Sequence, residues 1–203
     1  MSDPIIIDLF VEDQAHEDLL RPMVRRLGAE EGRSVRIRVR SARGGRGRAL
    51  TEFEVYQKSM LNGLSDAVPH IIVAAIDANC ASYQATRQDI ADTCDPRFVE
   101  LCVAACPDPH IERWYLADLP TFHRVVGTTP TFPREKCERD FYKHVLAQAV
   151  IDGGNPPTLG GLEFAEELAQ NMDLHRAGRS ETSLGHFVTD LRGKLRLLSS
   201  DKS

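Results

Sequence analysis

The feature that most constrains the fold is a pair of short apolar runs, each of which ends abruptly in an acidic residue. Residues 5–11 precede Glu12, and residues 69–76 precede Asp77. Apolar side chains fill most positions of these runs instead of alternating with polar ones, which is typical of strands buried on both faces. Such strands belong to parallel sheets covered by helices, so we expect an α/β fold built on a mostly parallel sheet.

Glu12 and Asp77 stand where these two predicted strands end. In an open parallel sheet, ligands bind in the crevice beyond the carboxyl ends of the strands. Carboxylates gathered in such a crevice are costly unless they hold a cation or take part in chemistry. We therefore expect the two acids to meet at one edge of the sheet and to form an acidic metal site.

The rest of the first two-thirds of the chain predicts alternating helices and strands. In residues 34–40, three arginines alternate with apolar side chains, which predicts a strand near the sheet edge with one solvated, basic face. Helical apolar spacing and short apolar runs locate the other elements. We expect helices over residues 15–31, 52–62 and 81–92, and a further strand within residues 98–105.

Residues 41–50 form an arginine-rich and glycine-rich segment. Three glycines lie within four residues, so we expect an irregular loop. Guanidinium groups on a chain that can approach an anion closely suit phosphate contact, and we interpret Arg43, Arg46 and Arg48 in this way. A solvated surface loop is the alternative. The segment does not have the spacing of a P-loop, which argues against a nucleotide hydrolase.

The last third of the chain has the composition of a helical region. Residues 136–150, 159–172 and 184–198 show helical apolar spacing, and a proline-containing linker precedes them. We expect three parts in sequence. These are an α/β domain over residues 1–130, a helical extension packed on it over residues 131–198, and a tail over residues 199–203.

Bulk properties place the chain among soluble globular proteins. Its 203 residues carry a net charge of −5, so any nucleic-acid binding must use a local basic patch. It has no basic leader and no apolar run that approaches the ~20 residues of a membrane span, so we expect a cytoplasmic protein without membrane contact. The five cysteines follow no zinc spacing, and we interpret them as reduced thiols.

Four side chains are the candidate metal ligands. Glu12, Asp77, Asn79 and Glu112 offer oxygen atoms after three successive predicted strands. Oxygen ligands suit Mg²⁺, which takes one or two carboxylates and completes its shell with water and phosphate oxygens. Glu12, Asp77 and Glu112 are also the candidate catalytic residues, because carboxylates beside an ion can assist hydrolysis.

Further side chains are close enough in sequence to support this site, namely His16, Glu17 and Asp118. Because neutral imidazole is a poor Mg²⁺ ligand, we expect His16 to position a water molecule or the substrate. Arg113 and Lys136 are candidates for additional phosphate contacts.

Each of these assignments has a structural alternative. A single acid after a strand is commonly a helix N-cap, which applies to Asp77 and still more to Asp13. Asp118 could cap a helix near Pro120, and Glu17 could be an ordinary solvated residue. Lys136 could belong to an ordinary basic helix face.

Three short motifs, in the same order along the chain, resemble known proteins. Val11-Glu12, Glu17 at the head of the first helix, and residues 76–79 together resemble the Toprim arrangement shared by topoisomerases, primases and the nuclease half of overcoming-lysogenization-defect proteins. Residues 107–118 resemble a signature of uncharacterised bacterial Toprim-like proteins, which are often encoded beside ATPases in phage-defence loci. The resemblance covers about the first 130 residues.

The resemblance implies a Rossmann-like sheet of the Toprim type, Mg²⁺ or Mn²⁺ as cofactor, and cleavage of nucleic acid. Glu12 would be the general base or a ligand, and Asp77 a ligand. Two positions depart from the pattern, since Asp13 replaces the usual glycine and Asn79 replaces the second acid of the Asp-x-Asp motif. Asparagine offers a neutral carbonyl oxygen, and Glu112 could supply the missing charge.

The function that we expect is that of a metal-dependent nuclease. It would act on nucleic acid, with DNA favoured over RNA, as the effector of a bacterial phage-defence system with an ATPase partner, and it could form oligomers. The alternative is a non-catalytic Toprim-like subunit that recruits a partner or nucleic acid. A third possibility is a phosphotransfer or nucleotide-processing enzyme that uses the same acids.

Overall fold

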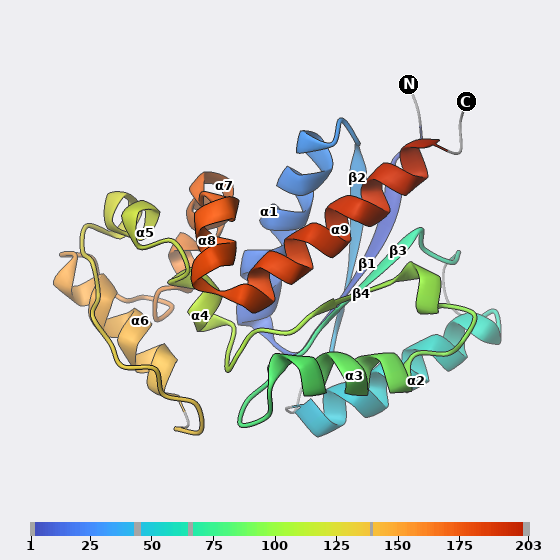
Figure 1. The fold of residues 1–203 in the computed structure, drawn as a ribbon, viewed down its shortest axis with the longest axis horizontal. Helices are drawn as coiled ribbons and strands as arrows, with labels where there is room; N and C mark the ends of the chain where they lie inside the picture. Colours follow the sequence, from blue (N-terminus) through green and yellow to red (C-terminus); the bar gives the residue numbers. More distant parts are fainter. Residues whose placement is uncertain (1–2, 43–45, 65–66, 139, 201–203) are drawn as a thin grey trace.

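The structure is a computed structural model that describes residues 3–42, 46–64, 67–138 and 140–200. Its centre is a sheet of four parallel strands in the order β2-β1-β3-β4, which confirms the predicted α/β fold (Figure 1). The strands are β1 (Ile5–Val11), β2 (Val35–Ser41), β3 (Ile71–Ala75) and β4 (Cys102–Ala105).

The register of the sheet brings the carboxyl ends of the strands to one edge. Val11, the last residue of β1, lies beside Ser41 of β2 and Ala75 of β3. Ala75 in turn lies beside Ala105, the last residue of β4. Every segment that leaves a strand therefore starts from the same rim of the sheet.

Helices cover both faces of the sheet, as parallel strands require. The three crossover helices are α1 (Gln14–Glu30), α2 (Arg46–Leu61) and α3 (Tyr83–Thr93). Side chains of α1 pack in one hydrophobic core with alternate residues of β1 and β3, and side chains of α2 and α3 pack with the other residues in a second core. Figure 1 shows α1 on one side of the sheet and α2 and α3 on the other.

The C-terminal helices extend the first of these cores. They are α4 (Glu112–Tyr115), α5 (Leu119–Val126), α6 (Phe141–Asp152), α7 (Ala165–Asn171), α8 (Leu174–Ser180) and α9 (Thr182–Ser200), with the short 3₁₀ turn η2 (Leu162–Phe164) before α7. Another 3₁₀ turn, η1 (Val99–Leu101), lies before β4. Leu146, Leu168 and Leu191 share this core with Leu19 of α1. Among the described residues, no helix has both the length and the apolar character that crossing a membrane would require.

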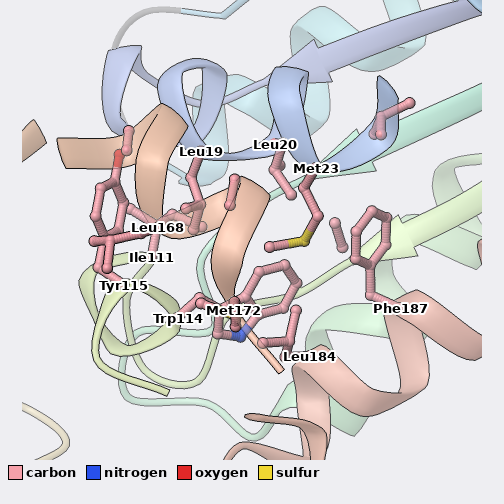
Figure 2. Close-up of a cluster of buried hydrophobic side chains, with 14 of the residues drawn as sticks. Leu19, Leu20, Met23, Ile111, Trp114, Tyr115, Leu168, Met172, Leu184 and Phe187 are labelled. Atoms are coloured by element: carbon pink, nitrogen blue, oxygen red, sulfur yellow. The ribbon is translucent and has the colours of Figure 1, made fainter. Parts of the chain in front are cut away.

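Trp114 anchors the segment after β4 in this core. Its ring is fully buried and stacks on Phe187 of α9 with 5.5 Å between the ring centroids, and its Nε1 donates to Ser183 Oγ at 3.0 Å. Figure 2 shows Leu20 and Met23 of α1 in the same cluster. The short helix α4 is thereby fixed between α1 and α9.

The basic face of β2 is less solvated than the alternation predicts. β2 is the edge strand, as expected, but Arg38 forms an ion pair with Asp8, which is buried within β1. Tyr56 Oη donates to the other oxygen of this carboxylate at 2.6 Å. Burial together with Asp8 raises the pKa of Tyr56, so the phenol stays a proton donor. The buried Asp8 explains why one arginine turns towards the sheet.

Two sequence boundaries differ from the structure. Helix α2 begins at Arg46 and runs through Gly47, whereas residues 41–50 were expected to form a loop and the helix to begin at residue 52. Ala49 and Phe53 are fully buried in the second core, and this burial outweighs the cost of about 1 kcal/mol for one helical glycine. Only the end of residues 98–105 is a strand, because η1 occupies residues 99–101.

The prediction of five reduced cysteines is wrong for one pair. Cys80, after β3, and Cys137, before α6, form a disulfide with 4.9 Å between their Cα atoms. Cys94, Cys102 and Cys106 remain thiols. The paired residues are 57 positions apart, so only the fold brings them together.

Replacement of Phe187 tests the cluster around Trp114. We expect Phe187→Ala to lower the free energy of unfolding by about 3–5 kcal/mol, because the variant leaves a cavity against Trp114. Leu197→Ala on the same helix removes a side chain that is 64% exposed and should change stability by less than about 0.5 kcal/mol. Denaturant unfolding followed by the fluorescence of the single tryptophan measures both. Equal losses in the two variants would contradict this packing.

Candidate metal centre

Glu12 and Asp77 lie at the point where the strand order changes direction. From β1 the chain crosses one face of the sheet to β2, and from β2 it crosses the other face to β3, on the far side of β1. The crevice beyond the carboxyl ends of β1 and β3 is the position where open parallel sheets bind ligands. Glu12 and Asp77 each follow one of these strands by one or two residues.

The backbone holds these two acids against each other. Glu12 N donates to the carbonyl of Ala75 at 3.1 Å, which continues the pairing of β1 and β3 by one residue. Asp77 N donates to Glu12 Oε2 at 3.1 Å. The expectation that the two strand ends bring these acids together is therefore met.

The start of α1 adds His16 to the two acids. Asp13 is the N-cap of this helix, as expected, and its Oδ1 accepts from His16 N at 3.1 Å. The cap places His16 in the first turn, beside the strand ends. Glu12, His16 and Asp77 each offer one ligand atom, and these atoms all lie within 4.8 Å of one another. All three side chains are buried.

The imidazole of His16 lies between two carboxylates. Its Nδ1 is 2.8 Å from Asp13 Oδ1, and its Nε2 is 3.1 Å from Asp77 Oδ1. The second contact is short, but it is not aligned as a hydrogen bond, and neither of its two buried atoms forms one with any described residue. Buried polar atoms without a partner are uncommon and mark a place where a ligand can bind.

His110 is a fourth member of the site, and the sequence analysis missed it. Its Nδ1 lies 3.3 Å from Asp77 Oδ2, and its side chain is 19% exposed. His110 follows two prolines in the segment after β4, and the backbone of that segment accepts hydrogen bonds from Ala78 N and Asn79 N. Its position two residues before Glu112, at the third strand exit, was the available signal.

The pKa shifts of the two central acids reflect burial and neighbouring charge. Burial and the charge of Asp77 raise the pKa of Glu12 above its ordinary value. Burial acts in the same direction on Asp77, but the positive charges of His16 and His110 outweigh it and lower the pKa of Asp77. Asp77 is therefore the more firmly ionised of the two acids.

The histidine shifts have the same origin. Burial would lower the pKa of His16, but the charge of Asp77 and the hydrogen bond with Asp13 outweigh burial and raise it to about 10. Burial likewise opposes the hydrogen bonds from His16 that lower the pKa of Asp13 to about 2. The hydrogen bond with Asp77 raises the pKa of His110. Without a metal ion, the acids of the site therefore favour the protonated, positively charged forms of His16 and His110.

Glu112 lies beside this cluster at a pocket. Its side chain is buried at the first turn of α4, and burial together with the charge of Asp77 raises its pKa. The pocket has a volume of about 370 Å³, and Asp13, Lys143 and aliphatic side chains such as Leu146 and Leu162 line it with Glu112. Glu112 lies outside the group of three side chains whose ligand atoms converge.

Asn79 stabilises the turn that follows Asp77. Its φ of 53° is in the left-handed region, which asparagine tolerates better than most residues. Its Nδ2 donates to the carbonyl of Asp77 at 3.4 Å, and its backbone N donates to the carbonyl of Pro109 at 2.9 Å. The observed contacts of this predicted ligand are thus with backbone.

The other predicted supporting acids have partners elsewhere. Glu17 lies 3.5 Å from Arg21 on the surface of α1. Asp118 is fully buried, where its Oδ1 accepts from Arg176 Nε at 2.6 Å and its Oδ2 accepts from Asp173 N at 2.8 Å. Asp118 therefore links α5 to α8. The side chains that contact the cluster are instead those of Asp13 and His110.

The predicted phosphate-binding residues that the structure describes are paired with carboxylates. Arg48 Nε lies 2.7 Å from Glu52, and Lys136 Nζ lies 2.8 Å from Asp108. Arg113 is buried in an ion pair with Glu181, and its guanidinium lies over the rings of Phe132 and Tyr142. Arg43 and the side chain of Arg46 lie outside the described residues.

The donors at this site fit a divalent cation. Two carboxylates and an imidazole are typical ligands of divalent metals, and their ligand atoms converge in a buried space.

No protein-family model matches this chain, and no curated protein or solved structure matches it either.

The raised pKa of His16 predicts a pH dependence of stability for the metal-free protein. The folded state keeps the His16 proton up to about pH 10, whereas the unfolded state loses it near 6.5. The folded state binds more protons in this window, so the free energy of unfolding should fall as the pH rises through it and be largest below it.

Denaturant unfolding with a chelator present measures this dependence, and nitrogen NMR of the His16 ring reports its protonation directly. The variant His16→Asn should show a smaller decline between pH 6.5 and 10, because the contribution of His16 is lost and that of His110 remains. Titration of His16 near 6.5 in the folded protein would contradict the observed ion pairing.

Proposed function

We propose that this chain is a metal-dependent nuclease that hydrolyses phosphodiester bonds with Mg²⁺ or Mn²⁺. The observation that carries the proposal is the convergence of Glu12, His16 and Asp77 at the switch point of a parallel sheet. Burying two carboxylates together is costly unless a cation neutralises them. A phosphodiester is a substrate whose hydrolysis benefits from a cation in this position.

Each residue has a role in this proposal. A bound divalent ion would polarise a phosphoryl oxygen and lower the pKa of a water molecule. Asp77 is the ionised ligand, and Glu12, whose pKa is raised, is a ligand or the general base. His110 is partly exposed, and its hydrogen bond with Asp77 raises its pKa, so we assign it to protonation of the leaving oxygen. Glu112, whose pKa is raised by burial, is a candidate to accept or donate a proton in the neighbouring pocket.

Substrate binding would use basic groups near the same rim. Lys143 lines the pocket beside Glu112, and the charge of Glu112 contributes to raising the pKa of this lysine above its ordinary value. The arginine-rich segment starts after Ser41, where β2 ends at the same rim of the sheet as Glu12. These positions support phosphate contacts with nucleic acid, for which we favour DNA over RNA.

The biological setting follows from the Toprim resemblance. We propose that the chain is a Toprim-like effector of a bacterial phage-defence system, that it acts in the cytoplasm, and that it works with an ATPase partner. Dependence on a partner would keep a nuclease inactive until invading nucleic acid is detected.

A second candidate is a non-catalytic subunit that keeps the scaffold and recruits a partner or nucleic acid. Two observations favour it. Asn79 stands where the Toprim pattern has a second acid, which removes one charge from the site. His16 also lies close enough to Asp13 and Asp77 to neutralise them as an imidazolium, so the fold can hold these acids without an ion.

Cleavage by purified protein tests the nuclease proposal. We expect the full chain with Mn²⁺ to nick DNA, and a chelator to stop the reaction. If the chain alone is inactive, the same assay is repeated with its ATPase partner added. Glu12→Gln and Asp77→Asn should each reduce the rate by at least about 100-fold, because each removes an ionised group from the site. Glu17→Gln is the matched control, since this acid lies in the same region and pairs with Arg21.

Unchanged cleavage in both Glu12→Gln and Asp77→Asn would contradict the proposed site. If every form is inactive and an Asp77→Ala variant still binds its partner, the non-catalytic subunit is the correct alternative.

A further inference from the structure

We infer that the centre is a nitrogen-ligated transition-metal site, in which His16 is a ligand through Nε2 and Asp13 orients its ring, so that the site selects Mn²⁺ or Zn²⁺ over Mg²⁺. The inference rests on the metal centre of the proposed function and specifies its cofactor. It departs from the expectation that His16 only positions water or substrate.

The first observation is the position of His16 Nε2. This atom is completely buried and lies 3.1 Å from Asp77 Oδ1, yet the two atoms are not aligned as a hydrogen bond. Neighbouring ligand atoms at about 2.1 Å from one ion lie roughly 3 Å apart, which is the spacing observed here. Glu12 provides the third converging atom. Two buried polar atoms at this spacing that do not bond to each other can both bind one ion.

The second observation is independent and concerns the other ring nitrogen. His16 Nδ1 lies 2.8 Å from Asp13 Oδ1. A histidine that binds metal through one nitrogen almost always donates its other N–H to a carboxylate or carbonyl, which fixes the ring and increases its basicity. Asp13 is itself fixed, because the same oxygen caps α1 by accepting from His16 N. The ring is therefore held with Nε2 towards Asp77.

The donor set disfavours Mg²⁺. Imidazole is a good ligand for transition metals, whereas Mg²⁺ requires oxygen atoms in octahedral geometry. An ion that accepts nitrogen therefore fits this site better than Mg²⁺ does.

Ion binding to the metal-stripped full chain tests the inference. Isothermal titration with Mn²⁺, Zn²⁺ and Mg²⁺ at one fixed pH should give affinities for Mn²⁺ and Zn²⁺ at least about 10-fold higher than for Mg²⁺. Pulsed electron paramagnetic resonance of bound Mn²⁺ should detect coupling to one imidazole nitrogen. Neither readout depends on cleavage.

Three variants locate the effect in His16. His16→Asp replaces nitrogen by oxygen and should remove the nitrogen coupling and reduce the preference for Mn²⁺ over Mg²⁺. Asp13→Asn should weaken Mn²⁺ binding by about 10-fold to 100-fold while the nitrogen coupling remains, because it changes only the group that orients the ring. His144→Asn, an exposed histidine at the neighbouring pocket, is the matched control and should change nothing.

The outcomes separate this inference from the proposed function. Equal affinity for Mg²⁺ and Mn²⁺, or Mn²⁺ bound without nitrogen coupling, would overturn the inference and leave a metal-dependent nuclease intact. Nitrogen-coupled Mn²⁺ in a protein that cleaves nothing would support the inference and contradict the nuclease. Absence of ion binding would overturn both and leave His16 as an imidazolium that only bridges Asp13 and Asp77.

Discussion

The structure depends on neutralising acids that the fold buries at one rim of its sheet. A parallel register brings Glu12 and Asp77 together, and burial makes their negative charges expensive. His16 lies between Asp77 and Asp13 and can reduce this cost in either of two ways. As an imidazolium it neutralises the acids directly, and as a neutral ring it can share a cation with them. The positive charge at the site can therefore come either from a proton on His16 or from a metal ion.

The hydrophobic cores fix the strands and helices that carry the side chains of this site. The core on the α1 side fixes β1, β3 and α1, and through them the two acids and His16. Trp114 and Tyr115 fix α4, since Trp114 stacks on Phe187 and Tyr115 Oη donates to the carbonyl of Ala15 at 2.9 Å. These contacts set the position of Glu112 and the segment that carries His110. Apolar packing far from the rim therefore determines the geometry of the polar site.

The parts of this arrangement that follow from local pattern were predictable. The buried strands, the edge position of β2, the Asp13 cap and the meeting of Glu12 with Asp77 all follow from residue order and parallel topology. Contacts between distant segments that do not follow from the strand topology were not predictable. The pairing of Asp118 with Arg176 and the disulfide between Cys80 and Cys137 are examples. His16 was noticed, but its burial and its position between two carboxylates needed the packed first turn of α1.

A crystal structure with Mn²⁺, with anomalous scattering recorded at the manganese edge, tests the shared-cation site most directly. We expect one strong anomalous peak within about 2.3 Å of carboxylate oxygens of Glu12 and Asp77 and of His16 Nε2, with Asp13 still bonded to Nδ1. A peak elsewhere, or no peak while His16 still bridges Asp13 and Asp77, would contradict the claim that these residues share a cation.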